Sequence, residues 1–269
     1  MSTAAAPSIA VPAWQRLGRA RAFIAVRSFV LFVLLWAALA AWKASPLQLP
    51  SPLAVAAALW RLAASGELLQ HAAISSARLG IALVVAIVLA VPLGFAMGLS
   101  KRLDAYVDPL VELLRPISGI AWIPLALFIF GIGDTLPVFI MVYVAFFPIL
   151  LNTVAGVRQV DPKLVAAART MGVGRGAMLR HVVVPAALPT VMVGLRLAFA
   201  GAWSAIVAAE LIGAPSGLGF AIEWNRELLM TPKVFAFIAV IGVVGYLCDA
   251  LLRALQGWLT PWADGMELA

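Results

Sequence analysis

The chain has 269 residues, of which 64% are hydrophobic and only 12% are charged, and its formal net charge is +7. A soluble domain is about 45–50% apolar and about 25% charged, and a domain of this size cannot hide such an apolar excess from water. The single cysteine excludes a fold held together by intrachain disulfides. These values leave a polytopic α-helical membrane protein. The basic charge then indicates either a nucleic-acid partner or basic cytoplasmic loops, and the positions of the basic residues decide between them.

Six stretches of the chain have the length of about 20 mostly apolar residues that a membrane-spanning helix needs. The third stretch is interrupted by Pro116, Gly119 and Pro124. Membrane helices tolerate such residues where neighbouring groups satisfy the freed backbone. The predicted fold class is therefore all-α and integral to the membrane. Its six transmembrane helices are expected at about 23–42, 74–99, 106–130, 135–157, 186–210 and 232–255.

The first apolar stretch has an alternative interpretation as a cleaved signal peptide. Three arginines precede it, and Ala38-Leu39-Ala40 resembles a cleavage site. However, the apolar run extends past the short apolar core of a signal peptide. Trp36 and Trp42 also suit the aromatic belt of a membrane anchor. We therefore predict a retained first span, preceded by a basic cytoplasmic segment at residues 1–22.

The basic residues are unequally divided between the two sides of the predicted membrane domain. With the N-terminus inside, three Lys or Arg residues fall on outer segments and five lie in or beside spans. Because an excess of Lys and Arg marks cytoplasmic loops, both termini are predicted to be cytoplasmic, and no nucleic-acid partner is expected. The six-helix membrane domain then covers 23–256, and a cytoplasmic tail covers 257–269. The eleven inner residues are Arg16, Arg19, Arg21, Lys101, Arg102, Arg158, Lys163, Arg169, Arg175, Arg180 and Arg253.

A short segment between the first two spans carries a helix-start signal. Ser51 can cap a helix whose first residue is Pro52, and an alanine-rich stretch follows up to Ser65-Gly66. We predict a short interfacial helix on the outer face, with a loop as the alternative. In the second span, Gly94 and Gly98 permit close helix contact, either within the subunit or at a dimer interface.

The longest predicted cytoplasmic segment, at about 157–185, has a specific local pattern. Asp161 can cap a helix that begins with Pro162, and Gly172 suits the left-handed residue that ends it. A second short helix is expected from about Arg175. The pattern predicts a basic helix–Gly–helix finger that inserts into a cytoplasmic partner, or else a basic turn lying on anionic lipid. A small face for close contact with a partner is expected at Ala166, Ala167 and Ala168.

The spacing of residues in this finger resembles the EAA loop of permease subunits of binding-protein-dependent ABC importers. The motif consists of Glu-Ala-Ala, a glycine after three residues, and Ile-x-Leu-Pro further on. The residues that match it, with two conservative changes to valine, are Ala167, Ala168, Gly172, Val182, Val184 and Pro185, and Arg169 follows in its usual place. The chain departs from the motif at Ala166, where the family has Glu.

Further motifs along most of the chain resemble the sulfonate/taurine/nitrate branch of that family, and the taurine-type members most. They include Leu49-Pro50-Ser51-Pro52, Ser76-Ala77-Arg78, Arg115-Pro116-Ile117, Ala121-Trp122-Ile123-Pro124-Leu125 and Ala208-Ala209-Glu210-Leu211-Ile212.

This resemblance implies a type I ABC importer permease in a bacterial inner membrane. Two copies would form a pore, a periplasmic binding protein would deliver the substrate, and two cytoplasmic ATPase subunits would drive transport. Taurine or an alkanesulfonate is the expected substrate, with nitrate, bicarbonate and small aromatic or pyrimidine-type molecules as alternatives. Contact with the ATPase is assigned by the resemblance to Asp161, Ala166, Ala167, Ala168, Arg169, Gly172, Arg175 and Pro185.

The sequence carries no motif for enzymatic chemistry of its own. A P-loop requires Gly-Lys followed by Ser or Thr, and none of the four lysines follows a glycine. ATP and Mg²⁺ are therefore expected on the partner ATPase and no cofactor on this chain. His71, His181 and Cys248 lie far apart in the sequence, so packing or an interface hydrogen bond is the preferred explanation for them over a metal site.

Ionisable residues within spans are costly and usually face a bundle interior or a cavity. Arg115 or Arg196 is expected to give the translocation path a positive field that accepts an anion. The alternative is ion pairing or snorkelling, and Glu112 lies three residues before Arg115 on the same helix face. A less favoured function is a proton-coupled transporter that uses Glu112 and Glu210, and an intramembrane enzyme lacks a nucleophile–base pair. The path candidates are Arg115, Trp122, Asn152, Arg196, Ser204 and Glu210.

Overall fold

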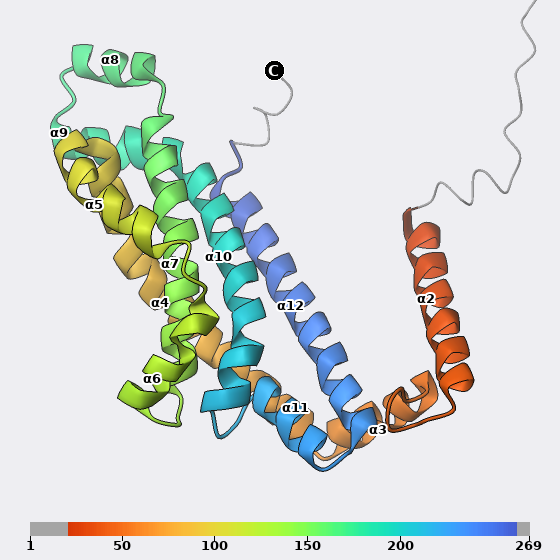
Figure 1. The fold of residues 1–269 in the computed structure, drawn as a ribbon. Helices are drawn as coiled ribbons and strands as arrows, with labels where there is room; N and C mark the ends of the chain where they lie inside the picture. The colour runs from red at the N-terminus through yellow and green to blue at the C-terminus, as the bar shows by residue number, and fades with distance from the viewer. Residues whose placement is uncertain (1–20, 263–269) are drawn as a thin grey trace, which may run out of the picture.

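A computed structural model describes residues 21–262, and every regular element within them is a helix (Figure 1). Almost all of the predicted basic segment 1–22 and the end of the tail 257–269 lie outside the described residues. In chain order the elements are α2 (Arg21–Lys43), α3 (Pro52–Ala64), α4 (Glu67–Leu99), α5 (Lys101–Leu114), η1 (Gly119–Trp122), α6 (Ile123–Phe130), α7 (Thr135–Arg158), α8 (Pro162–Thr170), α9 (Arg175–Met178), η2 (Leu179–Val183), α10 (Val184–Gly213), α11 (Leu218–Glu227) and α12 (Thr231–Leu259).

Five helical runs in the described chain are long and apolar enough to cross a membrane. They are α2, α4, α7, α12 and the continuous run Arg175–Gly213, which joins α9, η2 and α10. A sixth span forms if α5 and the η1–α6 segment, which are bent by 82° relative to each other, are taken together. The predicted all-α membrane class is thus confirmed, and the third of the six predicted spans is broken.

The third span starts earlier than the predicted 106–130, and its break falls among the interrupting residues Pro116 and Gly119 that the sequence indicated. The helix begins at Lys101 and ends at Leu114, just before Pro116, which lacks an N–H donor and clashes with the preceding turn. Its only buried residue is Val111, and its remaining face carries charged side chains. Helix α5 is therefore amphipathic, with charged residues mainly in its first half and apolar residues such as Leu110, Leu113 and Leu114 toward its end.

The short helix α3 begins as predicted, because the Ser51 side chain accepts a hydrogen bond from the Ala54 amide at 3.2 Å and Pro52 occupies the first turn. Two features of the neighbouring helices were not predicted. Helix α4 starts at Glu67, seven residues before the expected span. Helix α11 was missed, and it starts after Gly217, whose φ of 109° is accessible mainly to glycine.

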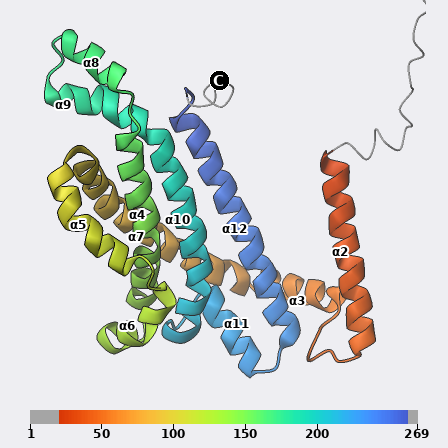
Figure 2. The ribbon, with the colours of Figure 1, turned by 45° about the horizontal axis from the view of Figure 1, so that its top comes forward.

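The core of the bundle consists of α4, α7 and α10, which approach closely through small residues (Figure 2). A Cβ added to Gly94 would lie 2.6 Å from Cβ of Thr153, and one added to Gly98 would lie 2.7 Å from Cβ of Val157. The Gly94–Gly98 motif therefore packs α4 on α7 within the subunit. Buried small residues recur on that face of α4 at every fourth position, namely Ala82, Ala86, Ala90 and Gly94.

Helix α2 stands apart from this bundle in both ribbon views and meets it near α3 (Figures 1 and 2). Nε1 of Trp36 donates a hydrogen bond to the Pro50 carbonyl at 3.1 Å, and its ring stacks on Phe235 of α12 at 5.9 Å. Among the described side chains of α2, only Ala40 is buried. An apolar cavity of about 460 Å³ separates α2 from α12.

Candidate functional site

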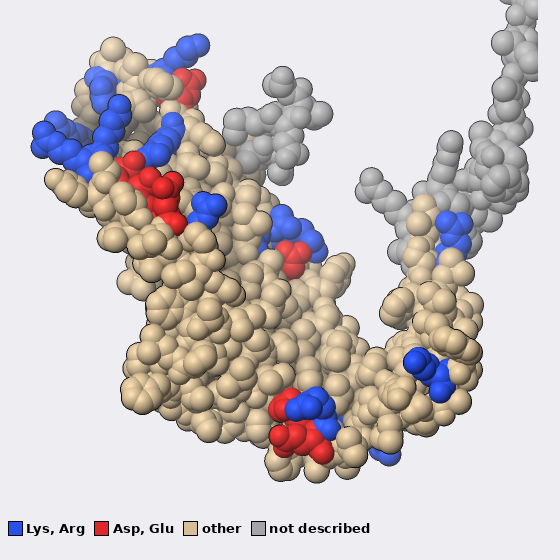
Figure 3. Space-filling model, in the orientation of Figure 1, with Lys and Arg blue, Asp and Glu red and all other residues tan. Residues whose placement is uncertain are grey.

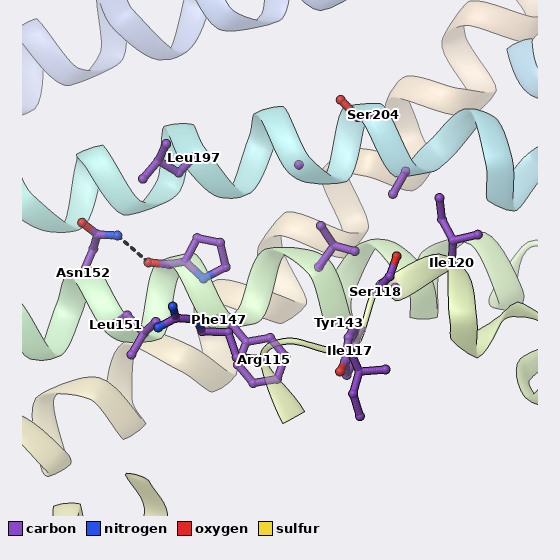
Figure 4. A pocket seen from close by; sticks show the side chains of 15 residues that line it. Arg115, Ile117, Ser118, Ile120, Tyr143, Phe147, Leu151, Asn152, Leu197 and Ser204 are labelled. Atoms are coloured by element: carbon purple, nitrogen blue, oxygen red, sulfur yellow. Dashed lines mark hydrogen bonds between the residues drawn. The ribbon is translucent and has the colours of Figure 1, made fainter. Parts of the chain in front are cut away.

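A cavity of about 750 Å³ lies where the broken span meets α7 and α10 (Figure 4). The segment between α5 and η1 forms one wall, and α7 and α10 form the others. Pro116 ends α5, and the carbonyl of Leu114 at this break accepts a hydrogen bond from the Tyr143 hydroxyl at 2.6 Å. Gly119 lets η1 lie directly on α7, since a Cβ there would be 2.4 Å from Val144. The break in the helix therefore creates the cavity and fixes its shape.

The wall of this cavity combines one cation, several polar groups and a mostly apolar surface. Within the part of the chain that the structure describes, Arg115 is the one charged side chain on the wall. Such a surface suits a small anion with an apolar body, because the guanidinium attracts the negative charge and the apolar side chains contact the apolar part of the molecule. The other lining residues are Ile117, Ser118, Gly119, Ile120, Tyr143, Val144, Phe147, Pro148, Leu151, Asn152, Leu197, Gly201, Ser204 and Ala205.

Three of the six predicted path residues lie on this wall. Arg115 is exposed and has no ion-pair partner within residues 21–262, so the possible pair with Glu112 does not form. Asn152 donates a hydrogen bond to the Pro148 carbonyl at 2.8 Å, and Ser204 donates one to the Ala200 carbonyl at 3.0 Å. The oxygen of each side chain remains free of these two hydrogen bonds as an acceptor.

The other three predicted path residues are not on this wall. Trp122 packs against the lining residue Tyr143 with ring centroids 5.5 Å apart but does not itself line the cavity. Arg196 lies 3.5 Å from Asp249 of α12. Glu210 is fully buried in an ion cluster at the end of α10. Sequence position alone placed these residues in spans, but only tertiary packing decides which side of a helix faces the cavity.

Two functional candidates on the cavity wall were missed by the sequence analysis. Ser118 and Tyr143 both belong to the break, one following Pro116 and the other holding the end of α5. The signal for Ser118 was present, because a polar residue beside a helix-breaking proline in a span is expected to line a cavity. No local pattern pointed to Tyr143.

An ion cluster joins four segments at the end of the bundle opposite α8. Arg78 of α4 donates from Nη1 to Glu210 at 2.7 Å and to the Ser216 carbonyl at 2.7 Å, and it also pairs with Asp134. Both oxygens of Glu210 lie 2.8 Å from the Ser75 hydroxyl, and one accepts from the Gly219 amide at 3.0 Å. The cluster therefore satisfies a buried carboxylate and a buried guanidinium together.

Substitution of Glu210 by alanine is expected to destabilise the folded protein by about 3 kcal/mol, because Arg78 and Ser75 lose their buried partner. Thermal unfolding of detergent-purified protein measures this as a lowered midpoint. Glu223→Gln is the matched control, since it breaks an exposed ion pair with Arg226 and leaves the buried cluster intact. Equal midpoints for Glu210→Ala and the control would contradict the assignment.

The predicted finger forms at the other end of the bundle. The Asp161 side chain accepts a hydrogen bond from the Lys163 amide at 2.8 Å and caps α8, and Gly172 ends that turn with a φ of 75°. Basic side chains gather at the end of the bundle that carries α8 and α9, and the rest of the face shown in Figure 3 is mostly uncharged, with small groups of mixed charge. A cavity of about 790 Å³ beneath the finger is lined in part by Arg169 and Arg175.

One detail of the finger corrects the sequence analysis. The residues Ala166 and Ala167 are exposed, but Ala168 faces inward and packs with Met178 and Val183 in a small core under α8. Pro185 lies in the first turn of α10, half-buried. The exposed small face is therefore limited to two alanines, and the third holds α8 on the base of the finger.

The helical bundle, its broken span and its cavity define a multi-pass membrane protein with the architecture of a transporter. Residues 82–264 match the family described as "Binding-protein-dependent transport system inner membrane component". The chain belongs to this family. Its members are permease subunits of ABC importers, which are not enzymes, and ATP hydrolysis lies in separate subunits.

Curated relatives assign the chain to the branch that the sequence motifs indicated. It is 39% identical over 238 residues to the taurine transport system permease protein TauC of Escherichia coli (strain K12), covering 87% of this chain and 86% of the relative. It is 40% identical over 220 residues to the putative aliphatic sulfonates transport permease protein SsuC of the same strain, with coverages of 82% and 84%. The predicted membership of the sulfonate/taurine branch is thus confirmed.

Similarity also extends to other transporters. The bicarbonate transport system permease protein CmpB of Synechococcus elongatus is 36% identical over 156 residues, covering 58% of this chain and 56% of the relative. Among solved structures, the MetNI methionine ABC transporter in inward-facing conformations superposes with a TM-score of 0.52 at 18% identity, over 67% of this chain and 92% of that chain. This likeness supports the fold, and it carries no information on substrate.

Proposed function

We propose that the protein forms the translocation path of an ATP-driven importer for a small organic anion, with taurine or a related alkanesulfonate as its substrate. The observation that carries this proposal is the cavity at the broken span. Its wall offers the Arg115 guanidinium together with the hydroxyls of Ser118 and Ser204, amid apolar side chains. A sulfonate head group would bind at the guanidinium, and a short carbon chain would lie on Phe147 and Leu197.

The relatives support this choice of substrate class. Matches to taurine and sulfonate permeases extend over 81–87% of the chain, whereas the match to the bicarbonate permease covers 58%. Nitrate and bicarbonate remain alternatives because either anion would bind the same guanidinium, and small aromatic or pyrimidine-type molecules remain alternatives because the wall is mostly apolar. A proton relay through Glu210 is disfavoured, since that carboxylate is buried against Arg78 and lies away from the cavity.

The finger of α8 and α9 is proposed as the coupling helix that docks on a cytoplasmic ATPase, with ATP and Mg²⁺ bound there. Its exposed Leu164 and Met171 offer apolar contacts between the basic side chains. The gathering of basic residues at this end also supports an orientation in the bacterial inner membrane with the finger and both termini in the cytoplasm. A periplasmic binding protein would then dock at the opposite end, near α3 and α11, and lipid would cover the apolar perimeter.

A homodimer is proposed because the cavity is incomplete in one subunit. Ile120, Leu197 and Ser204 on its wall are exposed, so a second copy facing them would close the path. Helix α2 supports the same assembly, since a single apolar helix that stands apart from its own bundle can pack against the other copy.

The proposal is tested by reconstituting the chain with its ATPase and its binding protein in liposomes. ATP-dependent accumulation of labelled taurine is expected, with competition by other alkanesulfonates and none by nitrate or bicarbonate at equal concentration. Ligand binding by the isolated binding protein, measured by calorimetry, identifies the substrate independently. Uptake driven by a proton gradient in vesicles without ATPase, or purification of the tagged chain without any ATPase, would overturn the proposal.

A further inference from the structure

The ion cluster around Arg78 contains two carboxylates in contrasting environments. The Glu210 side chain is 0% exposed and accepts hydrogen bonds from Arg78, Ser75 and the Gly219 amide. The Asp134 side chain is 75% exposed, and its Oδ1 accepts from Nε of Arg78 at 3.0 Å and from Nη2 of the same guanidinium. One carboxylate is therefore locked inside the protein, and the other holds the same cation from the solvent side.

Asp134 precedes α7 at the position where an aspartate ordinarily caps a helix. Its side chain makes no capping hydrogen bond to α7, because the carboxylate is turned toward Arg78 instead. The turn before it is held by a second contact, in which the Gly133 amide donates to the Gly213 carbonyl at 2.9 Å. The turn between α6 and α7 is thus attached to α4 and to the end of α10.

This turn is the far end of the segment that forms a wall of the cavity. From Ser118 the chain runs through η1 and α6 to Asp134. Toward α7 this segment packs through the aromatic pairs Trp122–Tyr143 and Phe130–Phe139. Toward α10 it shares a buried cluster in which the α10 residues are the small side chains Ala205 and Ala209. Small side chains bury little apolar area, so the hold of this segment on α10 depends in part on how its end is attached.

The two ion pairs of Arg78 differ in what their separation costs. Separation of Arg78 from Glu210 would leave two buried charges without partners. Separation of Arg78 from Asp134 returns an exposed carboxylate to water while Glu210 and the Ser216 carbonyl still hold the guanidinium. The Asp134 pair is therefore the one that can open and close during a conformational cycle.

We propose that Asp134 is a positioning residue for transport, which through Arg78 holds the η1–α6 segment, whose first residues line the cavity, against α10 and releases it when the path opens at that end. This inference rests on the proposed function, because it takes the cavity to be the translocation path. It assigns no contact between Asp134 and the substrate. Asp134 acts through the attachment of the wall that carries Ser118 and Gly119.

The inference is tested with Asp134→Asn in the complete, reconstituted transporter, with Asp134→Glu as the conservative variant. Hydrogen exchange of residues 131–134 is expected to become about tenfold faster in Asp134→Asn, with exchange in α4 and α7 unchanged. Uptake per assembled transporter is expected to fall and the ATP hydrolysed per substrate molecule to rise. Asp134→Glu keeps a carboxylate and is expected to restore both.

The control is Glu223→Gln, which breaks an exposed ion pair in α11 without touching the turn. In the unsubstituted protein, a hydrogen bond from Arg226 lowers the pKa of the Glu223 carboxyl, so the Glu223–Arg226 pair is charged at neutral pH. Unchanged exchange at 131–134 in Asp134→Asn, or equal effects in the control, would overturn the inference. Faster exchange at 131–134 in Asp134→Asn would support the attachment of the turn by Asp134. If an Arg115→Gln transporter then showed normal uptake, the assignment of the cavity as the translocation path would be refuted separately.

Discussion

Replacement of Gly172 by alanine is expected to reduce ATP-dependent uptake about tenfold while the transmembrane bundle stays folded. A non-glycine residue in the left-handed conformation costs about 1–2 kcal/mol, and about 1.4 kcal/mol corresponds to a factor of ten. Gly172 has a φ of 75°, and its amide donates to the Arg169 carbonyl at 3.0 Å at the end of α8. No atom lies within 4 Å of an added Cβ, so the effect is one of backbone strain. The strain would change the angle at which α8 projects, and with it the proposed docking of the finger on the ATPase.

Gly172→Asp is expected to abolish uptake, since it adds a negative charge to the same strain. Gly174→Asp is the matched control, because Gly174 has a φ of −67° at the start of α9, where aspartate is a favoured capping residue. Co-purification measures whether the ATPase still binds, and uptake of radiolabelled substrate into liposomes measures whether transport still follows. Normal uptake by Gly172→Asp would show that the finger does not couple ATP hydrolysis to transport.

Substitution of Arg115 by glutamine is expected to lower uptake of an anionic substrate about tenfold or more, because a hydrogen bond to a charged group contributes about 1.5–3 kcal/mol. The change removes the charge from the cavity wall and keeps a polar, though shorter, side chain. The loss is expected in the uptake of substrate, with normal amounts of assembled transporter in the membrane.

Arg196→Gln provides the control within the same chain. Arg196 lies off the cavity beside Asp249, and Asp249 keeps a second partner in Arg253 at 2.5 Å. Near-normal uptake is therefore expected from Arg196→Gln. The anion path at the broken span is refuted if Arg115→Gln also transports at the normal rate.

Features that depend on local chemistry were predictable from the sequence. Ser51 and Asp161 cap helices as expected, and Gly172 takes the left-handed conformation that ends α8. These outcomes depend on groups a few residues apart, so the pattern of residue types is sufficient. The apolar runs likewise predicted the spans, because a membrane helix satisfies its own backbone whatever its neighbours are.

Features that depend on tertiary packing were not predictable. Glu210 was expected on the path, but it binds Arg78, which is 132 residues away in the sequence. Ala168 was expected on the partner-facing side of the finger, and the packing of α8 on Met178 turns it inward. Asp134 carried no signal, because its side chain forgoes the local cap for a distant cation. In each case a contact between remote segments outweighs the local preference.

Helix α10 connects the base of the finger with the ion cluster at the other end of the bundle. At a rise of 1.5 Å per residue, its 30 residues extend about 45 Å. A tilt of this helix about the end at the finger moves the opposite end by about 0.8 Å per degree. Glu210 lies close to that opposite end, so a rotation of a few degrees imposed on the base of the finger would displace the partner of Arg78 by more than the length tolerance of a hydrogen bond.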